Sequence, residues 1–384
     1  MSTYRFNFPT PIHFGAGVRS QLPEFLKSQN CKRPLLVTDR GVAALSFYKD
    51  IFGSLAKAGL EVQGFSEIWG NPVKSQVTMG VQAYKKHNAD SIVGLGGGAA
   101  LDVAKAIALM ATHPGDLFDY EDEKPGARSI DGPIPFFVAL PTTSGTGSEV
   151  GRSAVISDDK THLKKIIFSP KLLAKAVFAD PELTYDLPAK ITAATGMDAL
   201  THCVESYLAK GYHPICDGIA LEGVRLAAEN LVKCIRNPKD EQARSSMMMA
   251  SMMGAIAFQK GLGLTHSCAH ALGTVTDMHH GLANGIMIDH ALSFNTSAVP
   301  ERFKNLAIAA GLKEKDQNSE GFMGWLARLK SETEIPATLS EAGVKKEQIA
   351  MLADLAFQDS CHGNNPRACT REDFLKIFSE AFSS

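Results

Sequence analysis

The sequence predicts two domains in series: an α/β domain built on a parallel sheet over residues 1–186, and an all-helical domain over residues 187–384. Three observations predict this fold class. A chain of 384 residues accommodates two domains at ~100–200 residues each. Short apolar strands alternate with helical stretches in the first half, and the strand pattern stops after Asp180-Pro181. The remainder has the pattern of helices rich in Ala, Leu and Met, so we place the boundary near Leu187-Pro188.

The expected strands of the first domain are runs of four to six apolar or β-branched residues. Several runs are apolar on both faces, as in strands that lie between two helix layers of a parallel sheet. The N-terminal segment 1–8 also alternates like a strand. The five runs are 35–38, 60–65, 91–95, 136–140 and 176–179, and helices of the second domain are expected from Ile191, over 246–258 and over 371–382.

Composition excludes several classes of function. With 39 Lys+Arg against 41 Asp+Glu, the net charge of −2 gives no concentrated basic surface for nucleic acid or an anionic membrane. No apolar run approaches the ~20 residues that span a bilayer, and the N-terminus lacks the pattern of an export signal. The 7 cysteines are scattered and form no C-x-x-C pair. We therefore expect a cytoplasmic protein with reduced thiols.

Two turns predict a nucleotide site. Gly96–Gly98 lies between the expected strand 91–95 and a helical stretch that begins at Ala99. Glycines at such a turn let the backbone approach a pyrophosphate, although an ordinary flexible turn is the alternative. The segment 141–149 follows the expected strand 136–140 and contains five hydroxyls and two glycines. Open parallel sheets bind ligands at the carboxyl ends of their strands, where both turns are expected to lie.

Asp39 follows the expected strand 35–38 directly. A carboxylate at this position can accept hydrogen bonds from a ribose diol and repel a 2′-phosphate, which favours NAD over NADP. The neighbouring Arg40 argues in the opposite direction, because a cation there can attract the 2′-phosphate.

Histidines and one carboxylate predict a metal site in the second domain. Asp198 and His202 are spaced i,i+4 in a helical stretch, so both side chains emerge on one face. His266, His270 and His280 follow within fifteen residues of one another. A lone Asp-His pair is usually only a surface pair, but together with these histidines it makes an N,O site for Fe(II), Zn or Mn plausible. The sequence contains no H-E-x-x-H motif, so a zincin peptidase is disfavoured.

Taken together, the motifs resemble the iron-containing (group III) alcohol dehydrogenases over the whole chain. The resemblance implies a Rossmann-like N-terminal domain and a helical C-terminal domain, the dehydroquinate synthase-like fold, with the active site in the cleft between them. In this family Ser usually follows the three glycines, and Ala99 lacks its hydroxyl. The matching segments are G-G-G-A-A-L-D-V-A-K (96–105), P-T-T-S-G-T-G-S-E-V (141–150), A-D-P-E-L-T (179–184), A-T-G-M-D-A-L-T-H-C-V-E-S-Y (194–207), G-L-G-L-T-H-S-C-A-H-A-L-G (261–273), H-H-G-L-A-N-G-I (279–286) and N-N-P-R (364–367).

The resemblance also implies roles for individual residues. The family's second motif histidine, here His270, lies near the metal without binding it, and His279 has no counterpart among the ligands. The implied metal ligands are Asp198, His202, His266 and His280, and the implied NAD contacts are Asp39, Asn71, Gly97, Gly98, Thr142, Thr143 and Lys164.

These residues predict a reversible hydride transfer between NAD(H) and a small primary alcohol or aldehyde, with Fe2+ as the metal and Zn2+ as the alternative. His270 is the candidate for carrying the hydroxyl proton. Arg152 and the segment 258–263 resemble the 4-hydroxybutyrate dehydrogenase branch. An Arg near the cleft can hold a substrate carboxylate in a bidentate pair, and a surface Arg without such a role is the alternative.

Cys361 is a further candidate substrate residue, and its thiol, with Cys203 and Cys268, is expected to make the activity sensitive to oxidation. Two functions of other classes stay open: a dehydroquinate synthase-like lyase that uses NAD and a metal, and a non-catalytic metal- or nucleotide-binding protein. We expect a homo-oligomer from the family resemblance.

Overall fold

The computed structural model describes residues 8, 10–122 and 124–383, which form two compact units. The α/β unit contains residues 10–143 together with Gly147–Tyr185. The helical unit contains Phe8, Ser144–Thr146 and the chain from Asp186 onward. Of the N-terminal segment for which a strand is expected, residues 1–7 lie outside the described part of the chain.

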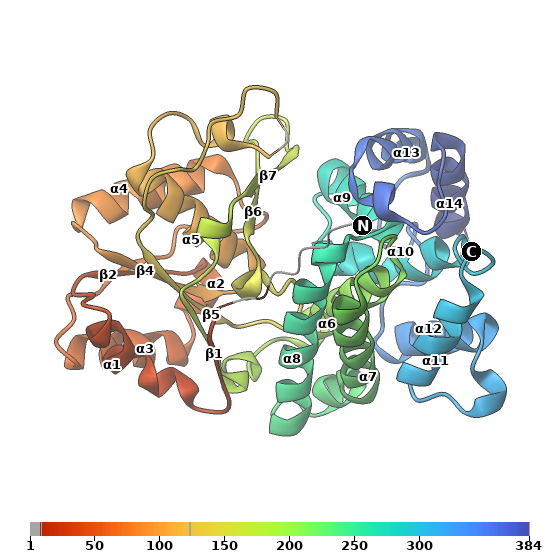
Figure 1. Cartoon of the computed structure of the whole chain (residues 1–384), viewed down its shortest axis with the longest axis horizontal. Coiled ribbons are helices and arrows are strands. Elements are labelled where there is room, and N and C mark those ends of the chain that lie inside the picture. The colour runs from red at the N-terminus through yellow and green to blue at the C-terminus, as the bar shows by residue number, and fades with distance from the viewer. Residues whose placement is uncertain (1–7, 9, 123, 384) are drawn as a thin grey trace. The chain divides into compact units, whose positions relative to one another are not determined.

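The α/β unit is built on a six-stranded sheet whose strands all run parallel (Figure 1). This confirms the predicted fold class and all five predicted strands. The strand predicted over 60–65 begins only at Gln63, because Leu60 lies in the turn that follows the preceding helix, where its N–H donates to Leu55 O. In spatial order the strands are β1 (Ile12–Phe14), β8 (Ala176–Ala179), β5 (Phe136–Pro141), β4 (Ser91–Gly96), β2 (Pro34–Val37) and β3 (Gln63–Phe65).

Alternate residues of the central strand β4 face two different helix layers. Val93 and Leu95 belong to the apolar cluster formed with α1 and α3. Gly94 points the other way, and a Cβ added to it would lie 3.1 Å from Leu101 Cδ2 on α5. A strand with helices on both faces must be apolar on both, which is the pattern in the sequence. The helices of this unit are α1 (Leu22–Ser28), α2 (Arg40–Ala43), α3 (Ser46–Lys57), α4 (Lys74–Lys86) and α5 (Gly98–Thr112).

A separate antiparallel hairpin, β6 (Ser153–Ser157) with β7 (Lys164–Phe168), was not expected from the sequence. It is joined to α5 by Lys105, whose side chain is fully buried. Lys105 Nζ donates to Ser148 O, Ser148 Oγ and Ser153 O at 2.7, 2.8 and 2.8 Å. Asp102 Oδ1 lies 3.7 Å from the same nitrogen. This buried cation therefore fixes the segment between β5 and β6 against α5.

The helical unit confirms the predicted all-α architecture. Its centre is α6, in which every residue from Thr192 to Leu208 is buried. Helices approach α6 closely where glycine removes a side chain: a Cβ on Gly281 would lie 2.3 Å from Ala194 O. The helices are α6 (Ala189–Leu208), α7 (Pro214–Arg236), α8 (Glu241–Ala257), α9 (Leu264–Thr276), α10 (His280–Ser293), α11 (Pro300–Ala309), α12 (Ser319–Glu332), α13 (Ile349–Gln358) and α14 (Arg371–Ser383).

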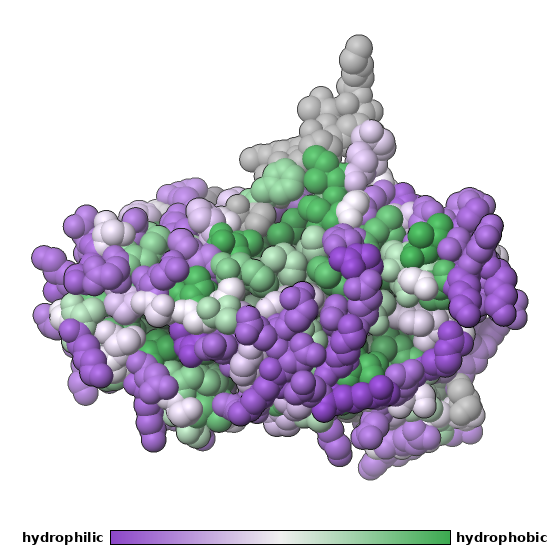
Figure 2. All heavy atoms as spheres, turned by 90° about the horizontal axis from the view of Figure 1, so that it is seen from below, coloured by the Kyte–Doolittle hydropathy of each residue, from purple (hydrophilic) through white to green (hydrophobic). Residues whose placement is uncertain are grey.

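Apolar side chains are used mainly in the cores of the two units. Phe303, Phe322 and Phe374, for example, are completely buried in the core of the helical unit. Among the described residues, every helix is too short or too polar to cross a bilayer. On the face shown in Figure 2, hydrophilic side chains are interspersed with smaller groups of hydrophobic ones.

A buried carboxyl group gives the stability of the α/β unit a distinctive pH dependence. Glu149 is 2% exposed and its Oε1 has no hydrogen-bond partner. Burial raises the pKa of Glu149 to about 7. Since the folded state holds the proton more tightly than the unfolded chain, stability from this group is present below pH ~4.5 and is lost as the pH rises through ~7.

We therefore expect Glu149→Gln to be nearly neutral at pH 4.5 and to stabilise the protein by about 3 kcal/mol at pH 8. Denaturant unfolding at both values, in one fixed metal state, measures this difference. Glu67→Gln serves as the control, because the Glu67 side chain is 51% exposed. Equal pH dependence in the wild type and Glu149→Gln would contradict the prediction.

Candidate functional site

Four predicted ligands come together in the helical unit. One donor atom from each of Asp198, His202, His266 and His280 lies within 4.8 Å of the others. Asp198 and His202 lie on one face of α6, as their i,i+4 spacing predicts. The other two come from α9 and from the first residue of α10. Three imidazoles and one carboxylate form an N,O donor set that suits Fe(II), Zn or Mn.

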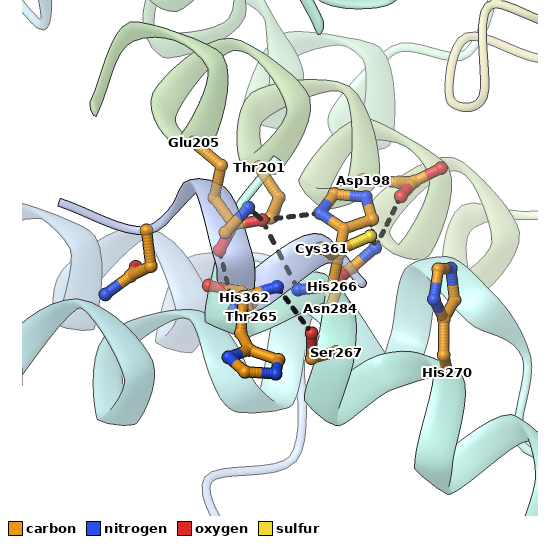
Figure 3. Close-up of polar contacts among 12 residues, drawn as sticks. Asp198, Thr201, Glu205, Thr265, His266, Ser267, His270, Asn284, Cys361 and His362 are labelled. Atoms are coloured by element: carbon orange, nitrogen blue, oxygen red, sulfur yellow. Dashed lines mark hydrogen bonds and ion pairs between the residues drawn. The ribbon is translucent and has the colours of Figure 1, made fainter. Parts of the chain in front are cut away.

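The protonation of these histidines suits metal binding. Burial lowers the pKa of His202 to about 4, so its ring is neutral at pH 7 and has a lone pair for a metal. His266 Nδ1 donates to Glu205 Oε2 at 2.7 Å (Figure 3). This hydrogen bond places the proton of His266 on Nδ1 and leaves Nε2 as the donor atom that faces the other ligands.

Glu205 also caps the N-terminus of α9. Its carboxylate accepts hydrogen bonds from the N–H groups of Gly263, Thr265 and His266 at 3.0, 2.6 and 3.3 Å. Burial alone would raise the pKa of Glu205, but the hydrogen bonds from His266, Thr265 and Gly263 lower it below its ordinary value. Glu205 is therefore anionic, and it fixes both the start of α9 and the ring of His266.

The side chain of Asn284 tests whether the four residues fit a cation. Its Nδ2 lies 2.7 Å from Asp198 Oδ1, 3.3 Å from His266 Nε2 and 3.2 Å from His280 Nε2 (Figure 3). Three lone pairs therefore converge on one donor, whose two hydrogens cannot serve all three well. A divalent cation satisfies such a set, so the residues present fit a metal.

A second group lies beside this set. His270 Nδ1 donates to Asp359 Oδ2 at 2.8 Å. The other oxygen of Asp359 accepts Ser267 Oγ at 2.8 Å and Cys361 N at 2.9 Å. The ring of His270 stacks on that of His280, with centroids 5.4 Å apart. The structure thus places two predicted residues, His270 and Cys361, next to the four candidate ligands.

The predicted nucleotide residues lie in the α/β unit. Gly97 is the N-cap of α5, and a Cβ on it would lie 3.2 Å from Thr143 Cγ2. Gly96 has φ +153°, and a Cβ there would lie 3.3 Å from Asp39 Oδ2. Thr142 N donates to Gly96 O at 3.1 Å. The two predicted turns and Asp39 therefore meet at the carboxyl ends of β2, β4 and β5, where Gly98 begins α5.

The structure pairs Arg40, the residue that weakens the inference of NAD over NADP, with a carboxylate and an aromatic ring. Its guanidinium bonds to Glu67 Oε2 at 2.5 Å and lies 4.1 Å from the centre of the Trp69 ring. Glu67 therefore neutralises the cation next to Asp39. Asn71 follows this segment, and Lys164 is the first residue of β7.

Arg152 lies in the α/β unit just before β6, where its guanidinium is 5.3 Å from the centre of the Phe168 ring. Among the described residues, no carboxylate forms an ion pair with Arg152. A guanidinium paired only with an aromatic ring has its N–H groups available for an anion.

Sequence reasoning missed three residues of the helical site: Glu205, Asn284 and Asp359. Glu205 had a usable signal, because it follows Asp198 by seven residues and His202 by three on the same helix face. Asn284 likewise follows His280 by four residues. Asp359 had none, since its partner His270 is 89 positions away in the sequence.

Replacing Glu205 by Gln is expected to weaken Fe2+ or Zn2+ binding by about tenfold to hundredfold, because the group that orients His266 loses its charge. Titration against a competing chelator measures the affinity. The matched control is Asp289→Asn, which removes the charge of the partly exposed carboxylate that accepts from the buried Lys330 Nζ at 2.6 Å, and should destabilise the fold without changing metal affinity. Equal affinities of the wild type and Glu205→Gln would show that Glu205 does not tune the site.

Protein-family models and individual known proteins match the chain over most of its length. Residues 9–181 match the model of the iron-containing alcohol dehydrogenases, and residues 192–382 match the C-terminal model of the Fe-containing alcohol dehydrogenase family. The chain is 36% identical to the NAD-dependent methanol dehydrogenase of Bacillus methanolicus, over 98% of this chain and 99% of that protein. It is 37% identical to the 4-hydroxybutyrate dehydrogenase of Cupriavidus necator, over 97% and 98%.

Among solved structures, a 1,3-propanediol oxidoreductase superposes with a TM-score of 0.93 at 35% identity, over 99% of this chain and 100% of that one. Both halves of the chain match models of one family, and the relatives align over nearly their full lengths. The chain therefore belongs to the iron-containing alcohol dehydrogenase family.

Proposed function

We propose that this chain catalyses reversible hydride transfer between NAD(H) and a small primary alcohol or its aldehyde, with Fe2+ at the site formed by Asp198, His202, His266 and His280. The observation that carries the proposal is the convergence of three imidazoles and one carboxylate in a family of alcohol dehydrogenases. The glycine turn beside Asp39 supports NAD as the hydride carrier, as does the name of the methanol dehydrogenase relative.

When bound, Fe2+ supplies a Lewis acid that stabilises negative charge on the substrate oxygen. The chain itself supplies the geometry. Glu205 fixes the ring of His266, and Asn284 bonds to Asp198, so two ligands are oriented before any metal arrives. Zn2+ generally binds N,O sites more tightly than Fe2+, so metal availability decides occupancy.

His270 is the group that we assign to the hydroxyl proton. It lies one helical turn from His266, and its side chain is 22% exposed, so it connects the ligand set with solvent. Its Nδ1 donates to Asp359, which leaves Nε2 to exchange a proton with the substrate. Asp359 thereby selects the tautomer that this role requires.

Fe2+-reconstituted wild type is expected to oxidise NADH with small aldehydes, and metal-free protein is expected to be inactive. His202→Ala should lose both Fe2+ and activity. His270→Ala should keep its Fe2+ but lose at least about tenfold in kcat, with a changed pH–rate profile. NADH absorbance and metal content measure these outcomes. Activity in the metal-free protein would refute the metal role, and an unchanged kcat and profile in His270→Ala would refute the proton role.

For the substrate, we propose an aldehyde that carries a carboxylate, such as succinate semialdehyde, the oxidised partner of 4-hydroxybutyrate. Sequence identity alone does not indicate the substrate, since the chain is 36% identical to the methanol dehydrogenase and 37% identical to the 4-hydroxybutyrate dehydrogenase. Arg152 favours the acid because its guanidinium packs on Phe168 and forms no ion pair within the described part of the chain, and a guanidinium can bind a carboxylate in a bidentate pair.

Arg152→Ala should lower kcat/KM for succinate semialdehyde by about tenfold to 150-fold, the range of a charge-assisted hydrogen bond, while propanal is affected less than about threefold. Arg152→Lys, which keeps the charge but not the planar fork, should lie between the wild type and Arg152→Ala. A wild type with no preference for the acid, or equal losses with both aldehydes, would rule this substrate class out.

A further inference from the structure

The helical unit contains a second set of potential metal ligands outside the four-residue site. One donor atom from each of His270, Asp359 and Cys361 lies within 4.8 Å of the other two. We propose that these three residues form a second metal site, which binds a divalent cation with affinity for thiolate, such as Zn2+ or Co2+.

The backbone already holds two of the three ligands in place. Asp359 follows α13 directly, and Cys361 begins the short 3-10 turn Cys361–Asn364. Cys361 N donates to Asp359 Oδ1 at 2.9 Å, and Ser267 Oγ donates to the same oxygen at 2.8 Å. The other carboxylate oxygen of Asp359, Oδ2, accepts from His270 Nδ1 at 2.8 Å. The carboxylate is therefore anchored through one oxygen and presents the other.

The nitrogen and the oxygen need only a small movement to admit a cation, and the sulfur of Cys361 lies within 4.8 Å of both. Ligand bonds of about 2.0 Å to nitrogen, 2.1 Å to oxygen and 2.3 Å to sulfur in a tetrahedral site put N and O about 3.4 Å apart, and S about 3.6 Å from each. The cation would replace the proton on His270 Nδ1, which would move to Nε2 of the same ring. His270 Nδ1 and Asp359 Oδ2, now 2.8 Å apart, need to part by about half an ångström. All three residues are partly exposed, so an ion can reach them from solvent.

The charge of the region favours a second cation. Burial alone would raise the pKa of Asp359, but the hydrogen bonds that it accepts from His270, Cys361 N and Ser267 hold that pKa well below its ordinary value. Asp198, Glu205 and Asp359 thus place three carboxylates around one divalent cation at the first site, which leaves one negative charge. A second divalent cation bound to the Cys361 thiolate brings the sum to zero.

The ligands of the two sites determine which site binds a cation first. The first site needs no deprotonation of a thiol, whereas burial, together with the charge of Asp359, raises the pKa of the Cys361 thiol well above its ordinary value. A cation at the second site must displace that proton, so it binds more weakly and fills second. Because the cation would occupy His270, it should inhibit the enzyme; this consequence rests on the proposed function, whereas the binding itself does not.

Titration of the Fe2+-loaded enzyme with Co2+ under anaerobic conditions tests the site. A thiolate ligand gives Co2+ a charge-transfer band in the near ultraviolet that Asp and His ligands do not give, so the first site stays silent. We expect the band in the wild type, its loss in Cys361→Ser, and at least about tenfold weaker Co2+ binding in Asp359→Asn. The matched control is Cys369→Ser, since Cys369 Sγ lies 3.4 Å from His362 Nδ1 and is a competing thiol–imidazole pair.

A wild type without the band, a band that persists in Cys361→Ser, or one lost in Cys369→Ser would overturn the proposal. A readout that needs no variant is protection of Cys361 from iodoacetamide by Zn2+, mapped by peptide mass, while the iron content stays constant. Inhibition by Zn2+ should weaken at least about tenfold in Cys361→Ser. If the band and the protection behave as expected but inhibition does not change, the metal site stands and the proton role of His270 fails.

Discussion

The hydrogen bonds of Glu205 are the constraint on which the helical site depends. The first N–H groups of any helix lack partners within the helix, and at the start of α9 this carboxylate accepts three of them. The same carboxylate accepts the Nδ1 proton of His266. The carboxylate that caps α9 therefore also orients the candidate metal ligand His266. Glu205 itself lies on α6, the helix that carries two further candidate ligands, Asp198 and His202. A glycine at position 281 completes the arrangement, because it lets His280 and α10 approach the backbone of α6.

Lys105 has a comparable structural role in the α/β unit: it is a buried charged side chain that fixes neighbouring segments through hydrogen bonds. A fully buried ammonium group is costly unless every N–H is satisfied. Here three hydrogen bonds to Ser148 and Ser153 do so, and Asp102 balances the charge. The segment after β5 is thereby fixed to α5, the helix whose first turn carries the glycines. In both units a buried ion holds the functional turn or helix start, and apolar packing supplies the rest.

The sequence predicted what depends on local spacing. Strands 91–95 and 136–140 were recognisable because strands buried on both faces are apolar throughout, and Asp198 with His202 because i,i+4 places two side chains on one face. Prediction from the sequence failed where the position or the contacts of a residue depend on a partner far away in the chain. The pairing of Arg40 with Glu67 had no local signal, and the hairpin β6–β7 depends on pairing across a turn that no local signal fixed.

The thiols show how the structure refines a compositional argument. Cys203 and Cys268 flank candidate ligands in the sequence, and both are completely buried in the helical core. Burial raises the pKa of Cys203 to about 12 and that of Cys268 well above its ordinary value, so neither forms the thiolate that reacts with oxidants. The pKa of the Cys361 thiol is raised as well, but Cys361 differs because it is partly exposed and lies beside a carboxylate and an imidazole with which it can share a cation. Of the three thiols, Cys361 is therefore the one that can react next to the candidate metal ligands. A bound cation would make it a thiolate ligand and would also shield it from oxidants.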